Sequence, residues 1–126
     1  MINEKYKRLI ETDSNVLPKK AIEMNYVFLA NCSEMKLDEY YRNFDKLLEL
    51  IEQLEKEFGK IIITSAFRSV SWELYKKRHG RSYHAFGRAF DFCCTNLPEA
   101  KKWLKNKIET KELIYYNSRN FIHVAL

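Results

Sequence analysis

Glycine, proline and cysteine are all scarce in this chain, with three, two and three copies among 126 residues. Because disordered segments are enriched in glycine and proline, their scarcity indicates an ordered globular protein. Long apolar runs are also missing, so we expect no segment that spans a bilayer and no membrane partner. The first ten residues lack the apolar core of a signal peptide, which predicts a protein that is cytoplasmic at synthesis.

The three cysteines match neither a disulfide framework nor a metal-binding motif. Cys93 and Cys94 are neighbours on a predicted strand, so their side chains point to opposite faces and make poor disulfide partners. The count is odd and no Cys-x-x-Cys spacing is present. We therefore expect reduced thiols that act as small buried hydrophobic residues.

Acidic residues are outnumbered, with 17 against 22 basic residues and a formal net charge of +5. This balance favours anionic partners, such as nucleic acid or the anionic polymers of a bacterial wall. The basic residues are spread along the chain, no nucleic-acid-binding motif is present, and most aromatic residues fall at core-like positions. We therefore expect no nucleic-acid partner. His79, in the basic stretch 76–81, is expected to be solvated.

Hydrophobic periodicity predicts helices in the first half of the chain and mainly strands in the second. Helices are expected over 2–11, 18–30, 38–58 and 97–108, and strands over 61–65, 88–94, 112–116 and 121–125. A turn is expected at 13–15, and 66–83 should be mostly loop with one helical turn at 72–77. This order predicts an α+β fold, with N-terminal helices packed on a small antiparallel sheet. The length fits a single domain over residues 1–126, and we expect a monomer.

The most informative stretch of the chain is Ser82-Tyr83-His84-Ala85-Phe86-Gly87-Arg88-Ala89-Phe90-Asp91. It places an imidazole and a carboxylate seven residues apart, and Gly87 permits a tight turn between them. A second histidine, His123, lies in a short apolar run near the C-terminus. Two histidines and one aspartate suffice for a catalytic zinc site with an open fourth position, so we expect Zn²⁺ at His84, Asp91 and His123. The alternative is that all three are structural residues.

The motif S-x-H-x-x-G-x-A-x-D, followed by a late apolar-His-apolar strand, resembles the LAS metallopeptidases. The upstream piece 61–69 is similar to that family's strand ending in S-x-[FY]-R-S. Including the helix before this strand, the resemblance runs from about Tyr41 to Leu126. The family includes D-alanyl-D-alanine carboxypeptidases, VanX-like dipeptidases and phage L-alanyl-D-glutamate endolysins. The resemblance implies a zinc-dependent peptidase whose partner is peptidoglycan or its peptide fragments, cut at a D-Ala-D-Ala or L-Ala-D-Glu type of bond.

The same resemblance implies roles for two further side chains. Arg68 would bind a substrate carboxylate or polarise the scissile carbonyl, a task suited to a planar, permanently charged group. The alternative is a surface arginine that pairs with a neighbouring acid. Ser82 would brace the site through a hydrogen bond to a metal ligand or to the substrate.

The general base is the point at which the sequence departs from the family pattern. Many members carry a Glu or Asp three residues before the last histidine, whereas this chain has Asn120, which cannot act as a base. If the two last strands pair so that Tyr116 lies opposite Phe121, Glu112 lies one diagonal step from His123 on the same face. Glu112 could then act as the base, or it could be an ordinary strand-end charge.

Other groups near the last histidine are weaker or different candidates. Glu99 lies in the predicted helix and Glu109 directly follows it, so neither has a defined position relative to His123. Tyr116 would share the face of Glu112 and could donate a hydrogen bond to a tetrahedral intermediate.

Several biological settings are open. A phage lysis enzyme is one, in which a separate membrane-disrupting protein would release the enzyme to the cell wall. A bacterial housekeeping enzyme and a cytosolic dipeptidase are others.

Asn120 also favours an alternative function, a catalytically inactive zinc-containing binding module of the same fold. Hedgehog signalling domains, which are similar to this family in their zinc site, are a precedent for that alternative.

Overall fold

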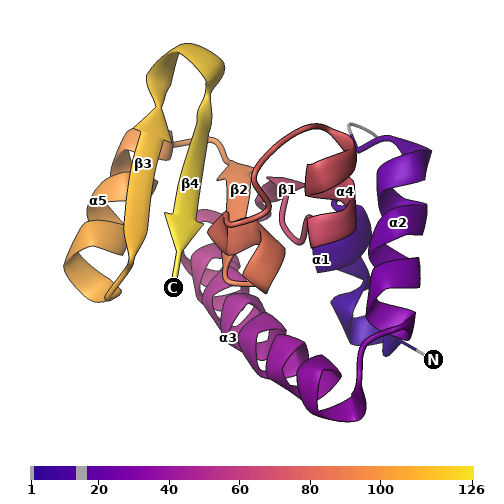
Figure 1. Cartoon of the computed structure of the whole chain (residues 1–126). Coiled ribbons are helices and arrows are strands. Elements are labelled where there is room, and N and C mark those ends of the chain that lie inside the picture. The colour runs from indigo at the N-terminus through magenta and orange to yellow at the C-terminus, as the bar shows by residue number, and fades with distance from the viewer. Residues whose placement is uncertain (1, 14–16) are drawn as a thin grey trace.

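The computed structural model describes residues 2–13 and 17–126 (Figure 1). Helices dominate the first half of the chain and strands the second. In chain order, the elements are η1 (Glu4–Tyr6), α1 (Lys7–Glu11), α2 (Lys19–Ala30), α3 (Glu34–Phe58), β1 (Ile62–Ser65), α4 (Val70–Tyr75), η2 (Tyr83–Phe86), β2 (Ala89–Cys93), α5 (Leu97–Lys107), β3 (Glu112–Tyr116), η3 (Asn117–Arg119) and β4 (Phe121–Ala125), where η marks a 3-10 turn.

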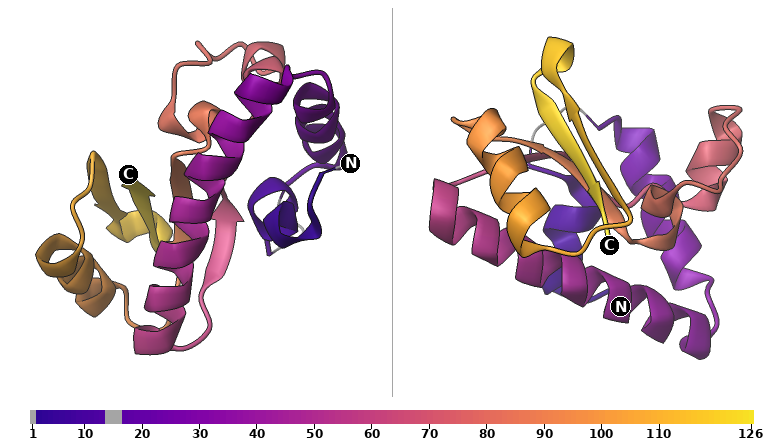
Figure 2. Two further views of the ribbon diagram at one scale, coloured as in Figure 1. Left: turned by 90° about the horizontal axis from the view of Figure 1, so that it is seen from below. Right: turned by 90° about the vertical axis from the view of Figure 1, so that its left-hand side faces the viewer.

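The four strands form one antiparallel sheet in the order β1-β2-β4-β3. Figure 1 shows α5 beside β3 at one end of the sheet and α1 and α2 beyond β1 at the other. The long helix α3 runs the length of the molecule (Figure 2). This arrangement confirms the expected α+β fold, with helices packed on a small antiparallel sheet.

The sheet has one buried face and one partly open face, because side chains alternate along each strand. Phe90, Phe92, Ile122 and Val124 point to the buried face and join the core formed with α3. The residues between them, Asp91 on β2 and His123 on β4, point to the other face. The core therefore holds the strands that carry these two polar side chains.

Two helix starts differ from the prediction because serine caps extend the helices toward the N-terminus. Helix α3 begins at Glu34 rather than near residue 38, since Ser33 Oγ accepts a hydrogen bond from the backbone N–H of Lys36 at 3.2 Å. Helix α4 begins at Val70, since Ser69 Oγ accepts from the backbone N–H of Trp72. The stretch 66–83, expected to be mostly loop, therefore contains α4 and the start of η2.

Other predictions near the N-terminus have mixed outcomes. The helix expected over 2–11 is the turn η1 followed by α1, and α2 follows Pro18 as expected. Of the turn expected at 13–15, residues 14 and 15 lie outside the described residues. The prediction of buried cysteines is wrong, because Cys32, Cys93 and Cys94 are all only partly buried, though all three are free thiols. Among the described residues, no helix is both long enough and apolar enough to cross a bilayer.

Candidate metal centre

Strand pairing brings Asp91 and His123 together. The antiparallel register of β2 and β4 sets these two residues directly opposite each other. His84 comes from the 3-10 turn η2, which leads into β2. Gly87 ends that turn in the left-handed conformation, with φ of 72°, as the tight turn of the sequence motif requires. The structure thus brings together all three residues predicted as metal ligands.

The three side chains converge through one atom each. Asp91 Oδ1 lies 2.8 Å from His123 Nδ1 and 3.2 Å from His84 Nε2. The two ring nitrogens are 3.2 Å apart. His84 is 2% exposed, and the side chains of Asp91 and His123 are 13% and 12% exposed. Two imidazole nitrogens and one carboxylate oxygen, partly shielded from water, form a donor set that suits zinc.

The tautomer of His84 also fits a metal site. Its Nδ1 lies 2.7 Å from the carbonyl oxygen of Ala66, which can only accept a hydrogen bond, so Nδ1 carries the proton. Its Nε2 therefore turns a lone pair toward Asp91 and His123. Metal-binding histidines are commonly held in this way, with the second ring nitrogen bound to a carbonyl or carboxylate.

The charges of the cluster favour an ionised carboxylate. Burial raises the pKa of Asp91, but its hydrogen bond with His123 and the nearby His84 ring outweigh burial and bring that pKa down to about 2. Burial lowers the pKa of His123, but its hydrogen bonds to Asp91 and Glu112 outweigh burial and raise the pKa above its usual value. Asp91 is therefore in the charged form that a cation requires.

The last hairpin has the register that places Glu112 on the face of His123. Tyr116 pairs with Phe121 and Ile114 with His123. Glu112 Oε1 accordingly lies 2.7 Å from His123 Nε2, and 42% of the Glu112 side chain is exposed. Since a carboxylate accepts, His123 donates through Nε2, the ring nitrogen on the side away from Asp91. The contact of Glu112 with the cluster thus runs through the His123 ring.

Arg68 lies beside η2. It also has an acidic neighbour, Glu73, as expected if Arg68 were a surface arginine paired with a nearby acid. Its backbone N–H donates to the carbonyl of His84 at 3.2 Å. Its Nε lies 3.2 Å from Oε1 of Glu73, a residue of α4 that is 1% exposed. A second arginine, Arg78, pairs with the other oxygen of Glu73. Glu73 was not among the residues expected from the sequence. The one sequence signal for it is an acidic residue five positions after Arg68.

Three residues assigned by the sequence have limited contact with the cluster. Ser82 Oγ accepts from the backbone N–H of His84 at 3.2 Å, so it supports the turn rather than the ring. Tyr116 stacks on Phe121 with ring centroids 4.6 Å apart and is 38% exposed. Asn120 has φ of 56° and ends the turn η3, a left-handed position that asparagine tolerates well.

Asn25 is a further residue that the sequence analysis missed. It is fully buried on α2, and its Nδ2 donates to the carbonyls of Ile10 and Phe67 at 3.2 and 3.0 Å. Its Oδ1 accepts from the backbone N–H of Ser69 at 2.9 Å. Asn25 therefore holds the chain on both sides of Arg68. A lone Asn within a predicted helix carries no sequence signal for such a role.

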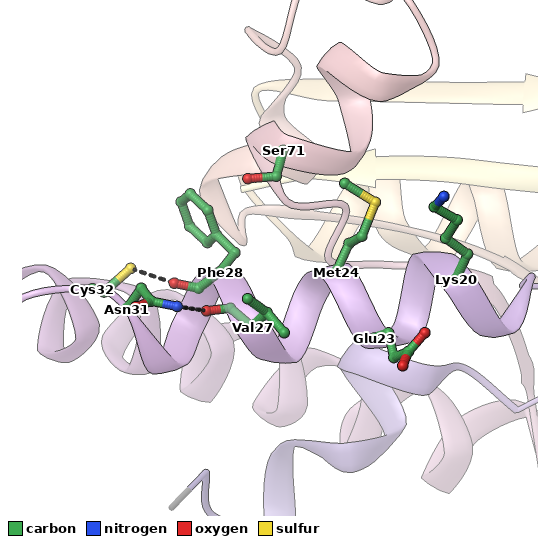
Figure 3. A pocket seen from close by; sticks show the side chains of 8 residues that line it. All are labelled: Lys20, Glu23, Met24, Val27, Phe28, Asn31, Cys32 and Ser71. Atoms are coloured by element: carbon green, nitrogen blue, oxygen red, sulfur yellow. Dashed lines mark hydrogen bonds between the residues drawn. The ribbon is translucent and has the colours of Figure 1, made fainter.

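A cavity of about 530 Å³ lies apart from this cluster, against α2 (Figure 3). Its lining comes from one side of α2, the residues just after that helix, and Ser71 of α4. These residues are Lys20, Glu23, Met24, Val27, Phe28, Asn31, Cys32 and Ser71. None of them is a residue predicted to bind metal or substrate, so the cavity does not mark the predicted site.

Comparison with protein-family models identifies the family described as Peptidase M15, over residues 22–125. No match was found among curated proteins or solved structures. The matched range runs from α2 through β4 and includes His84, Asp91 and His123. M15 peptidases depend on zinc, and these three residues are a group that could hold a metal ion. Since the match covers most of the chain, the protein belongs to the peptidase M15 family of zinc metallopeptidases.

Proposed function

We propose that the protein hydrolyses peptidoglycan stem peptides, at a bond of the D-Ala-D-Ala or L-Ala-D-Glu type. One observation carries the proposal: in a chain of the M15 family, His84 Nε2, Asp91 Oδ1 and His123 Nδ1 converge within 3.2 Å of one another. These atoms would hold the zinc ion. When bound, zinc acts as a Lewis acid that lowers the pKa of water to about 7 and polarises a carbonyl group.

In this proposal, Glu112 is the general base that takes a proton from the attacking water. Its Oε1 accepts from His123, while its partly exposed carboxylate has no other hydrogen bond recorded among the described residues. Proton transfer by a positioned carboxylate commonly contributes about 100-fold or more to the rate. The proximity to the cluster and the acidic character of Glu112 support this role.

Two other side chains contact the substrate, and a third, Ser82, supports the metal-binding residues. Arg68 pairs with a carboxylate of the peptide. It follows shortly after Ser65, the last residue of β1, which pairs with Asp91, and its guanidinium is permanently charged. Tyr116 is partly exposed on the face of His123 and donates a hydrogen bond to the reacting peptide. Ser82 acts through the turn that carries His84.

A second candidate function is a zinc-containing binding module without catalysis. Two observations favour it. Asn120 replaces the expected base, and Glu112 contacts His123 through the ring nitrogen that faces away from Asp91. In that case Glu112 would only orient the metal-binding ring, and no base would serve the bound water.

We also propose a setting: a monomeric single domain over residues 1–126 that acts on the wall after another protein releases it, as in phage lysis. The net charge of +5 supports attraction to the anionic wall. A bacterial housekeeping enzyme or a cytosolic dipeptidase would use the same chemistry, and the identity of the cleaved bond would help to separate these settings.

The deciding experiment is digestion of purified peptidoglycan by the zinc-loaded protein, with a chelator-treated control and mass spectrometry of the released fragments. We expect chelator-sensitive release of new amino termini, and the fragment masses would identify the bond. Stoichiometric zinc without release from several wall types would support the binding module instead.

The variant Glu112→Gln tests the base. We expect turnover to fall by about 100-fold or more while zinc content is retained, since the amide keeps the shape of the side chain but cannot accept the proton. Glu109→Gln is the matched control, because Glu109 is exposed and belongs to the connection before β3. Unchanged turnover in Glu112→Gln would assign the base elsewhere, and parallel loss of zinc would assign Glu112 to orienting His123.

A further inference from the structure

The backbone around Arg68 is held on two sides. Asn25, from α2, binds the carbonyl of Phe67 and the backbone N–H of Ser69, the two residues that flank Arg68. From the other side, the N–H of Arg68 itself donates to the carbonyl of His84. Because the same turn presents the His84 ring to the cluster, the backbone position of Arg68 is tied to the metal centre.

The side chain of Arg68 is held from a third direction. Glu73 is 1% exposed, and its carboxylate lies between two arginines. Oε1 is 3.2 Å from Arg68 Nε, and Oε2 pairs with Arg78 Nε. A buried carboxylate is retained only when it is paired, so at least one of these contacts is required for the fold. The group of three carries one net positive charge.

The contact between Arg68 and Glu73 leaves most of the guanidinium unused. Arg68 Nε is buried, and its alignment with Glu73 does not meet the geometry of a hydrogen bond. Nη1 and Nη2 have no recorded hydrogen bond to any residue in the described part of the chain. The Arg68 side chain is 25% exposed. An arginine held at Nε presents its two Nη groups as a fork that matches a carboxylate.

We propose that Glu73 is a positioning residue for substrate recognition. It holds the Nε edge of Arg68, so that the Nη1 and Nη2 edge meets a carboxylate of the peptide. The inference rests on the proposed function, in which Arg68 binds a peptide carboxylate, and it adds the buried residue that orients this arginine. A stem peptide offers two such groups, the C-terminal carboxylate and the α-carboxylate of D-glutamate.

The test measures binding rather than turnover. Three fluorescently labelled peptides are mixed with the zinc-loaded protein: L-Ala-γ-D-Glu-L-Lys-D-Ala-D-Ala, its C-terminal amide, and its analogue with D-isoglutamine in place of D-glutamate. Fluorescence anisotropy after rapid mixing gives the dissociation constant before any hydrolysis. The wild-type protein and Glu73→Gln are compared, with zinc content and thermal unfolding recorded for each.

For the wild-type protein, we expect one of the two amide substitutions to weaken binding by about tenfold, the size of one charge-assisted hydrogen-bonded pair. That substitution names the recognised carboxylate. In Glu73→Gln the acid should bind more weakly, and the difference between acid and amide should largely disappear. A wild-type protein that binds all three peptides equally, or a Glu73→Gln variant that keeps the full difference, would overturn the inference.

Arg78→Gln is the matched control. It breaks the other contact of Glu73 but leaves the pair with Arg68, so the preference for the acid should be retained. Equal loss in Arg78→Gln and Glu73→Gln would mean that Glu73 acts only by holding the segment around Arg78, which contradicts the inference. If Glu73→Gln does not fold, Glu73→Asp is compared in the same way. Aspartate keeps the buried charge but withdraws the carboxylate by about 1.5 Å, the length of one C–C bond.

Hydrolysis of the same peptides is measured separately. A protein that binds the acid preferentially but cleaves nothing would contradict the proposed peptidase function and leave the role of Glu73 supported. A protein that cleaves the peptides with the same preference in Glu73→Gln would support the peptidase and contradict the role of Glu73.

Discussion

Asp91 shows at the scale of one residue how position sets chemistry. It is the shared partner of both histidines, and its Oδ1 contacts a ring nitrogen of each. Burial alone would favour the protonated acid, yet the two imidazoles hold the pKa near 2. The carboxylate therefore stays charged throughout the physiological range. Its surroundings suit it to bind a cation.

We predict that Asp91→Asn abolishes stoichiometric zinc binding. Asparagine keeps the size of the side chain but removes the negative charge that zinc would share with the two histidines. Metal analysis by mass spectrometry after dialysis measures the effect. His79→Ala is the matched control, because His79 is exposed and its Nδ1 accepts a hydrogen bond from the backbone N–H of Arg81 in its own loop. Full zinc content in Asp91→Asn would contradict the assignment.

Some of the residues around the site could be predicted from the sequence, and others could not. His84, Asp91 and His123 were found because they stand in one short motif and one late strand, where spacing carries the signal. Glu73 and Asn25 were missed, because nothing in their immediate sequence distinguishes a buried brace from an ordinary helix residue. Their roles depend on partners that packing brings near, such as Phe67, which lies 42 residues from Asn25.

At the scale of elements, the turn between His84 and Asp91 is held by the core as well as by its own backbone. Gly87 has φ of 72°, and a Cβ atom built on it would lie 2.6 Å from Cε1 of Phe44 on α3. The turn therefore packs closely against the long helix. Any side chain at position 87 meets both backbone strain and the ring of a buried phenylalanine.

We predict that Gly87→Ala destabilises the fold by about 2–4 kcal/mol, the sum of left-handed strain and overpacking. Denaturant unfolding measures the loss. In a double-mutant cycle, Gly87→Ala is combined with Phe44→Leu, a smaller side chain that makes room beside the turn. The combined variant should lose less than the sum of the two single losses, by about 1 kcal/mol. Simple additivity would contradict contact between position 87 and the Phe44 ring.

The hairpin of β3 and β4 was the element best predicted from sequence. Its strands have the expected bounds, and the pairing of Tyr116 with Phe121, one of the registers that the sequence left open, brings Glu112 to His123. The starts of α3 and α4 were predicted less well, because single serine caps extend both helices beyond their clear hydrophobic pattern.

At the scale of the whole molecule, one arginine near the N-terminus joins three separate segments. Arg8 on α1 donates through Nη1 and Nη2 to both oxygens of Glu55 near the end of α3, at 2.7 and 2.9 Å. It also donates to both oxygens of Asp13 and to the carbonyl of Ile61, just before β1. Asp13 in turn accepts from the backbone N–H of Ile63. These contacts dock α1 against the helix and strand of the core.

We predict that Glu55→Gln lowers the free energy of unfolding by about 1–2 kcal/mol at pH 7, as expected for hydrogen bonds between charged groups. Hydrogen bonds from Arg8, against the opposing effect of burial, hold the pKa of Glu55 below its usual value of 4.5. A lowered pKa stabilises the fold above the unfolded-state pKa, and this contribution is lost as the pH falls through the folded-state pKa.

The difference between the wild-type protein and Glu55→Gln should therefore be largest near neutral pH and shrink below about pH 4. Denaturant unfolding at a series of pH values measures it. Glu52→Gln is the matched control, since Glu52 is exposed on the same helix. A difference that stays constant with pH would assign the effect of Glu55→Gln to something other than its charge.

The sequence by itself determined the α+β class, the approximate elements and the three residues of the candidate metal centre. These features follow from local regularities: the period of apolar residues, the turn residues, and the spacing of a short motif. Only the tertiary structure decided which nitrogen of each histidine faces Asp91, that Glu112 contacts the far side of His123, and that Glu73 lies buried behind Arg68. These are contacts between segments far apart in the chain, and they depend on how whole elements pack around one core.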